Sequence, residues 1–128
     1  LAILIGVPKP QSGVIKTEIE NEEKKKKQFS ISNYEVLDFA ANKYCLCSME
    51  PVTGRKHQLR IHSSHIKTPI LGDTKYGRRL PEIKINQKYM YLHASEIEFK
   101  LNDKTYKFKA DLPSHFKIAL KELGLSSK

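Results

Sequence analysis

Two alternating stretches on either side of Asn102-Asp103-Lys104 predict a β-hairpin in the last third of the chain. Residues 96–101 and 105–110 place an apolar side chain at every second position, which is the spacing of residues that share one face of a strand. Asparagine and aspartate between two such stretches are typical of a tight turn. The pattern therefore favours an antiparallel sheet.

Four earlier segments also predict strands. Residues 1–7 are an apolar run that is typical of a buried strand, and residues 14–20 alternate weakly. Residues 29–39 and 43–49 are rich in aromatic and β-branched side chains, which predicts a second hairpin or two adjacent strands. The charged residues 21–28, which lie between residues 14–20 and 29–39, include four consecutive lysines and predict a mobile loop, with contact to a phosphate backbone as the alternative.

Two segments have helical spacing. The final one repeats apolar residues at i, i+3, i+4 and i+7 over residues 116–123, with Pro113 at its start and Gly124 just past its end. Residues 55–67 also follow helical spacing, with Thr53 placed to cap a helix, although part of this segment could alternate as a strand. We therefore expect an α+β fold with a mixed, largely antiparallel sheet and flanking helices.

Positive charge is concentrated in one part of the chain. The 128 residues carry a net charge of +9, and residues 53–79 hold seven basic side chains and one acidic side chain. About two thirds of the net charge thus lies in about a fifth of the chain. Because this stretch also contains glycines and histidines, we interpret it as a phosphate-binding site rather than an ordinary solvated surface.

The cysteines and the hydropathy indicate the compartment. Cys45 and Cys47 are the only two, and neighbours spaced i, i+2 in a strand rarely form a good disulfide. They predict buried, reduced thiols, and hence a bacterial cytoplasm or an organelle matrix. No run approaches the roughly 18 apolar residues that a membrane-spanning helix needs, so no membrane association is expected.

The basic stretch contains the segment P-V-T-G-R-K-H-Q-L-R-I-H, followed by H-I-K-T-P-I-L-G-D-T-K-Y-G. A glycine turn here leads into a possible helix N-terminus, and arginines lie about one turn apart. Backbone N–H groups and arginines in such an arrangement make an anion site. These features alone do not identify a reaction.

The two segments resemble the late motif of RluA-type RNA pseudouridine synthases, the branch that contains RluA, RluC and RluD. The pattern of that motif is P-x-T-G-R-[TS]-H-Q-[IL]-R-x-H, then H-P-I-x-G-D-x-x-Y-G. The matching residues are Pro51, Thr53, Gly54, Arg55, His57, Gln58, Leu59, Arg60, His62, Pro69, Ile70, Gly72, Asp73, Tyr76 and Gly77. Two residues depart from the pattern. Lys56 stands where the family usually has Thr or Ser, and Thr68 stands where the family usually has His. Residues 1–15 and 92–94 resemble further segments of the family.

The resemblance implies an enzyme, a pseudouridine synthase, that isomerises specific uridines of RNA without a metal or cofactor. Large-subunit ribosomal RNA is the expected substrate, and transfer RNA is the alternative. The family's nucleophilic aspartate belongs to an R-L-D-x-x-T-S-G motif that this sequence does not contain. We therefore expect residues 1–128 to be the C-terminal portion of the catalytic domain and inactive alone. The missing N-terminal half is a possible partner, and a non-catalytic RNA-binding module is the alternative.

The resemblance also implies roles for individual residues. Arg60 would support catalysis by pairing with the nucleophilic aspartate and keeping it ionised. The expected RNA contacts are Arg55, Lys56, His57, Gln58 and Arg60, with a structural capping role as the alternative for the first three. Ile70 and Leu71 would form an apolar wall near the flipped base, or pack in the core. Asp73 is expected to be a loop residue rather than the nucleophile.

Overall fold

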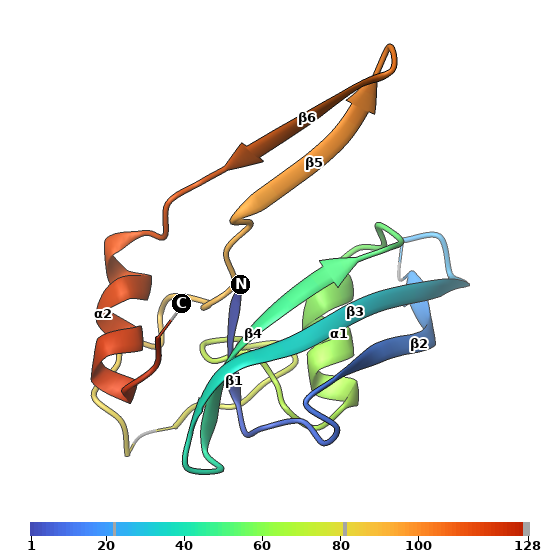
Figure 1. Cartoon of the computed structure of the whole chain (residues 1–128). Coiled ribbons are helices and arrows are strands. Elements are labelled where there is room, and N and C mark those ends of the chain that lie inside the picture. The colour runs from blue at the N-terminus through green and yellow to red at the C-terminus, as the bar shows by residue number, and fades with distance from the viewer. Residues whose placement is uncertain (22, 81, 127–128) are drawn as a thin grey trace.

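The computed structural model describes residues 1–21, 23–80 and 82–126. Four strands form one antiparallel sheet in the order β1-β4-β3-β2, and two more form a separate sheet (Figure 1). The elements are β1 (Ala2–Ile5), β2 (Ser12–Asn21), β3 (Lys26–Ala40), β4 (Tyr44–Pro51), α1 (Gln58–His65), β5 (Glu96–Leu101), β6 (Lys104–Lys109) and α2 (Ser114–Leu123). The expected α+β class with antiparallel sheets is confirmed. No helix in the described ranges is long and apolar enough to cross a membrane.

The predicted hairpin between residues 29–39 and 43–49 is confirmed as β3 and β4, which join at a turn where Ala41 has a φ of 53°. The mobile loop predicted for residues 21–28 is wrong in its extent, because Lys26 and Lys27 belong to β3. Lys27 lies directly opposite Glu20 of β2, and such opposite charges favour strand pairing. The two paired strands therefore extend into this connection from both sides, because β2 ends at Asn21 and β3 begins at Lys26.

β1 is fully buried and bonds on both edges. One edge pairs with β4. The other edge bonds to two distant segments, through Ile5 N–H to the Pro69 carbonyl at 2.8 Å and Ile3 N–H to the Tyr91 carbonyl at 3.0 Å. The predicted buried strand is thus confirmed, and it joins three parts of the chain.

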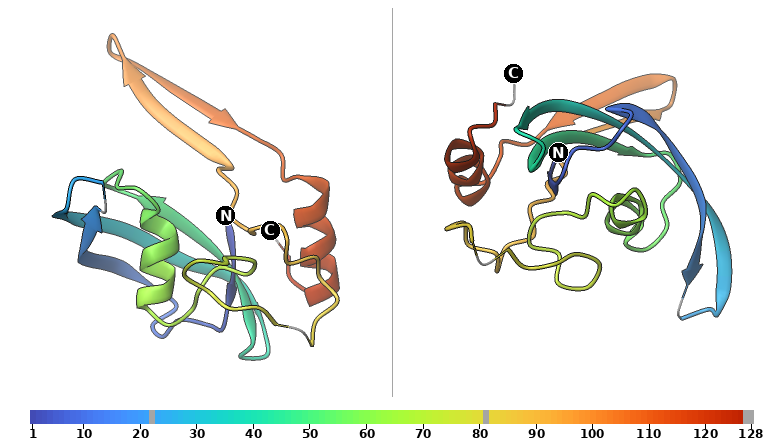
Figure 2. Two further views of the ribbon diagram at one scale, coloured as in Figure 1. Left: turned by 180° about the vertical axis from the view of Figure 1, so that it is seen from behind. Right: turned by 90° about the horizontal axis from the view of Figure 1, so that it is seen from below.

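Side chains of β1 alternate between two cores. Ile3 and Ile5 pack in a cluster with Phe116 and Leu120 of α2. Ala2 and Leu4 face a second cluster, whose other members are Ile15, Tyr34, Cys45, Cys47 and Ile70. α1 lies against the concave face of the four-stranded sheet, away from α2 (Figure 2).

The two cysteines are buried and unpaired, as the sequence predicts. Burial raises the pKa of the Cys45 thiol to about 12 and that of the Cys47 thiol to about 11. Both thiols are therefore protonated at neutral pH, and a protonated thiol is a poor nucleophile.

The two helices differ in how well the sequence predicts them. α2 is confirmed with its expected boundaries, since Pro113 precedes its first turn and Gly124 ends it with a φ of 72°. α1 is shorter than residues 55–67, because His57 and Lys67 adopt left-handed conformations with φ of 57° and 66°. Thr53 does not cap α1, since the helix has no side-chain cap.

The predicted hairpin around residues 102–104 is confirmed as β5 and β6. Asn102 and Asp103 have φ of 52° and 63°, the left-handed pair that a two-residue hairpin turn requires. Every residue of both strands is exposed. The hairpin projects away from the four-stranded sheet (Figure 1).

Candidate functional site

Gln58 fixes the turn that precedes α1. Its side chain is buried, and its Oε1 accepts hydrogen bonds from the Arg55 backbone N–H at 3.0 Å and the Thr53 hydroxyl at 2.6 Å. Its Nε2 donates to the Ile31 carbonyl at 2.7 Å and to the Ser32 hydroxyl at 2.8 Å. These bonds use the full capacity of the amide. Gln58 therefore holds the turn on β3, and this placement argues against its expected contact with RNA.

His62 continues the same network into the sheet. Its Nδ1 lies 2.7 Å from Ser32 Oγ, and its Nε2 lies 2.9 Å from Ser30 Oγ. The Ser30 hydroxyl donates its proton to the Thr17 carbonyl at 2.6 Å, so it can only accept from His62. Nε2 of His62 therefore carries the proton, and Nδ1 accepts from Ser32. Burial lowers the pKa of His62, which keeps the ring neutral.

We expect the substitution His62→Leu to lower the free energy of unfolding by about 3 kcal/mol, because it removes one hydrogen-bond partner from each of two buried serine hydroxyls, at about 1–3 kcal/mol each. Urea unfolding measures the difference, and His65→Leu at the exposed end of the same helix is the control. Because the pKa of His62 is depressed in the folded state, the wild type should also lose stability as pH falls below about 6.5. Equal unfolding midpoints for His62→Leu and His65→Leu would contradict the stabilising role of His62.

Arg60 of α1 and Asp73 of the following loop form a two-bond ion pair. Arg60 Nε donates to Asp73 Oδ2 at 3.0 Å, and its Nη2 donates to Oδ1 at 2.8 Å. The Asp73 side chain is fully buried, whereas that of Arg60 is 18% exposed. Burial alone would raise the pKa of Asp73, but Arg60 and the backbone N–H groups of Lys75 and Tyr76 outweigh it and lower that pKa. Asp73 is therefore an ionised, enclosed partner of Arg60 and is not presented to a substrate.

Two glycines of the motif shape the loop that carries Asp73. Gly72 has a φ of 85°, and a Cβ atom there would collide with the carbonyl oxygen of Tyr89. A Cβ atom at Gly77 would lie 2.7 Å from the Asp73 carbonyl oxygen. Because only glycine fits such close backbone approaches, these positions fix where the carboxylate of Asp73 meets α1.

Tyr76 covers the ion pair and contacts the start of α1. The Arg60 guanidinium lies 5.2 Å from the centroid of the Tyr76 ring, within the range of a cation–π contact. The Tyr76 hydroxyl lies 3.3 Å from His57 Nδ1. Loss of solvent and the positive charges of Arg60, Lys75 and Lys56 lower the pKa of His57. The motif residues therefore meet around the N-terminal end of α1.

The remaining predicted RNA contacts extend this basic surface. Arg55 Nε donates to the Phe29 carbonyl at 2.9 Å, which orients the guanidinium along β3. Lys56 forms an exposed ion pair with Glu23 at 2.8 Å, and such a pair exchanges readily with other anions. In the described part of the chain, no three His, Cys, Asp or Glu side chains gather as a metal site requires.

Ile70 and Leu71 are both fully buried. Ile70 packs in the cluster of Leu4, and Leu71 packs in the cluster of Ile3. The structure therefore places both residues in the core, which was the alternative to the expected base pocket. They are held there because they pair with β1.

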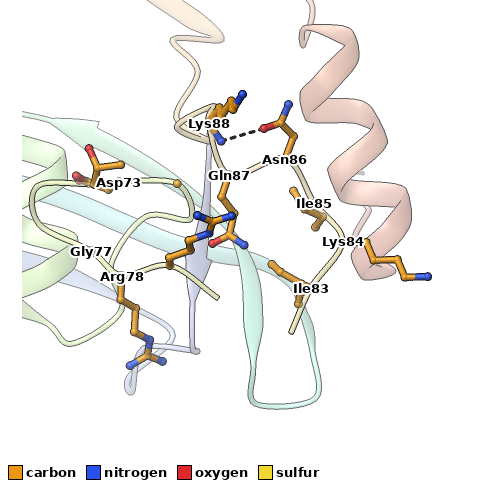
Figure 3. A pocket seen from close by; sticks show the side chains of 12 residues that line it. Asp73, Gly77, Arg78, Ile83, Lys84, Ile85, Asn86, Gln87 and Lys88 are labelled. Atoms are coloured by element: carbon orange, nitrogen blue, oxygen red, sulfur yellow. Dashed lines mark hydrogen bonds between the residues drawn. The ribbon is translucent and has the colours of Figure 1, made fainter. Parts of the chain in front are cut away.

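A cavity of about 630 Å³ opens beside Asp73. Figure 3 shows Asp73 and Gly77 on one side of it and residues 83–88 on the other. The Gln87 side chain bonds to both the backbone N–H and the carbonyl of Leu80, which joins the two walls. The basic residues that line the cavity are Arg78, Arg79, Lys84 and Lys88. No sequence pattern indicated this cavity, because residues 83–88 match no motif.

Comparison with known proteins supplies the family. The sequence model of the family described as RNA pseudouridylate synthase matches residues 2–65. The ribosomal large subunit pseudouridine synthase C of Rickettsia conorii is 42% identical over 102 residues, which cover 78% of this chain and 32% of that protein. The tRNA pseudouridine synthase C of Vibrio cholerae is 48% identical over 65 residues, or 48% of this chain and 27% of that protein.

A solved structure agrees with these matches. Human RNA Pseudouridylate Synthase Domain Containing 4 superposes with a TM-score of 0.84 at 25% sequence identity, covering 98% of this chain and 61% of that one. The chain spans only about a third of the Rickettsia relative's length. The matched range includes β1 to β4 and α1, and so the motif around Arg60. The chain belongs to the RNA pseudouridylate synthase family, in its RluA-type branch.

Proposed function

We propose that this chain forms one wall of an RNA pseudouridine synthase that isomerises specific uridines in large-subunit ribosomal RNA. The observation that carries the proposal is the fixed position of Arg60, which is bound to buried Asp73 and covered by Tyr76 at the basic end of α1. All three residues belong to the motif by which the sequence resembles RluA-type synthases. An arginine held this firmly keeps its charge at one point in space.

That charge suits the role of supporting a nucleophilic carboxylate. Arginine has five N–H donors, and the pair with Asp73 uses only one on Nε and one on Nη2. A second carboxylate beside Arg60 would be kept ionised and oriented by the adjacent cation. In this proposal the nucleophilic aspartate comes from outside residues 1–128, the C-terminal portion of the catalytic domain.

Arg55, Lys56 and His57 are proposed to bind RNA beside Arg60. They lie in the turn that Gln58 fixes, so their backbone is ordered before RNA arrives. Contacts to phosphate release counterions, and binding should therefore weaken with salt. The buried thiols support a reducing compartment, either a bacterial cytoplasm or an organelle matrix.

Ribosomal RNA is preferred over transfer RNA as the substrate. The Rickettsia relative, named for the large ribosomal subunit, aligns with 78% of this chain. The Vibrio relative, named for transfer RNA, aligns with 48%. The longer alignment supports the ribosomal substrate.

The test is a chimera in which this chain replaces the matched region of the Rickettsia conorii relative. We expect it to form pseudouridine in an unmodified large-subunit ribosomal RNA transcript, measured by mass spectrometry of nucleosides. The chain alone should bind the same transcript and leave it unmodified. Modification of a transfer RNA transcript instead would favour the alternative substrate. A folded chimera that modifies neither RNA would refute the proposal.

A non-catalytic RNA-binding module is the second candidate. It is favoured by the burial of Asp73, the carboxylate bound to Arg60, because this leaves no exposed acid in that ion pair. Salt-dependent RNA binding by the chain, together with an inactive chimera, would support this alternative.

A further inference from the structure

The β5–β6 hairpin has one apolar face and one charged face. In an antiparallel pair, residues directly opposite each other point to the same face. Ile97 lies opposite Phe108, and Phe99 lies opposite Tyr106. Leu101 ends the same row beside the turn, where it lies opposite Lys104, the one charged residue of this face. The alternate row consists of Glu96, Glu98, Lys100, Thr105, Lys107 and Lys109.

The apolar face is uncovered. Ile97 is 59% exposed and Phe108 is 55% exposed, and Phe99 stacks only on its hairpin neighbours Tyr106 and Phe108 in the described structure. A hairpin of two strands is marginally stable in water unless its apolar face packs against something. A contiguous row of exposed apolar side chains marks an interaction surface.

The charged face needs no such cover. Lys107 and Glu96 form an exposed ion pair at 2.9 Å. The other residues of the row are also exposed. One face of the hairpin therefore suits water, and the other suits the interior of a protein. This difference identifies the side on which a partner would dock.

The size of the related proteins indicates the partner. The human synthase domain contains the counterpart of 98% of this chain, and so of this hairpin, yet that counterpart is only 61% of its length. The Rickettsia relative likewise extends well beyond the matched region. These relatives therefore include a protein segment beyond the region that aligns with residues 1–128.

We propose that the apolar face of the β5–β6 hairpin, formed by Ile97, Phe99, Leu101, Tyr106 and Phe108, is the docking surface for the remaining part of the pseudouridine synthase domain. The inference rests on the proposed function, because it takes the partner from the same enzyme. Each strand also pairs along only one edge in the two-stranded sheet, so a strand of the partner could pair with the other edge. The hairpin would then link the wall that carries Arg60 to the wall that carries the nucleophile.

Thiol labelling tests this inference. The variants Phe99→Cys and Lys100→Cys place a thiol on the apolar and the charged face of the same strand. Cys45 and Cys47 are buried and protonated, so the introduced cysteine reacts first and the native pair reports any unfolding. Both variants should label rapidly in the isolated chain. In the chimera, Phe99→Cys should label at least about tenfold more slowly, while Lys100→Cys should keep its rate.

A second measurement covers the case in which the chimera does not fold. The chain is co-expressed with the remaining part of the Rickettsia relative, which carries an affinity tag. We expect the wild type and Lys100→Glu to copurify with it, and Phe99→Glu to be lost. Equal labelling of the two cysteines in a folded chimera, or copurification of Phe99→Glu, would overturn the inference. So would protection of Phe99→Cys in the isolated chain that rises with concentration, since a second copy would then cover the face.

These measurements need neither RNA nor turnover. An active chimera with an unprotected apolar face would refute the docking surface and leave the proposed function standing. A protected face in an inactive chimera would do the opposite.

Discussion

Replacing Asp73 with asparagine is expected to lower the free energy of unfolding by about 3 kcal/mol. Breaking a buried ion pair leaves the other charge uncompensated, at a typical cost of about 3–5 kcal/mol, and the partial exposure of Arg60 places this pair at the lower end. The asparagine amide also directs N–H donors at a guanidinium that has donors only. Urea unfolding at pH 7 measures the loss.

The exposed pair of Lys56 and Glu23 provides the control. Both side chains are mostly exposed, so Glu23→Gln should leave the unfolding midpoint unchanged. The pH dependence separates the charge of Asp73 from its shape. Because the folded pKa of Asp73 is lowered, its contribution is present above the unfolded pKa of about 4 and is lost as pH falls through the folded pKa. The Asp73→Asn variant should lack this part of the acid transition, and an unchanged transition would argue against the ion pair.

Replacing Arg60 with lysine in the active chimera is expected to reduce turnover by about 100-fold or more. Lysine keeps the positive charge but cannot form the planar two-bond pair, and loss of one preorganised electrostatic group typically costs about 100- to 1,000-fold in kcat. Because lysine can still neutralise Asp73, stability should fall less than in Asp73→Asn. Single-turnover rates of pseudouridine formation measure the effect.

His65→Gln is the matched control for Arg60→Lys. His65 lies on α1 but is exposed at its other end, so turnover should stay close to that of the parent chimera. If Arg60→Lys retained near-parental turnover, the arginine would have no part in the reaction and the proposed function would lose its main support.

Local signals in the sequence were sufficient for the parts of the fold that are formed locally. α2 needs only its apolar spacing and the punctuation of Pro113 and Gly124, and the β5–β6 hairpin needs only alternation around Asn102 and Asp103. Both were predicted close to their observed bounds. The cysteines were also predicted correctly, because a strand that is buried on both faces encloses its side chains regardless of the partners.

Predictions were poorer where tertiary contacts decide. The start of α1 depends on the bonds from Gln58 to β3, and no local pattern shows that His57 will adopt a left-handed conformation. Arg60 and Asp73 were both singled out by the motif, yet their pairing depends on a loop that folds back by close glycine contacts. No sequence pattern indicated a role for Ser30 and Ser32. Their bonds to the buried His62 form only when tertiary folding brings α1 against β3.

The position of β1 has a consequence for the order of folding. Its four residues are Ala2–Ile5, but their backbone partners lie as far along the chain as residues 69–71 and 91–92. Contacts of such long sequence separation form slowly, because a large loop must close first. Until then an apolar strand with two open edges remains exposed, and strands of this kind associate with other chains. We therefore expect refolding yield to fall steeply with protein concentration, with nascent β1 as the segment that aggregates.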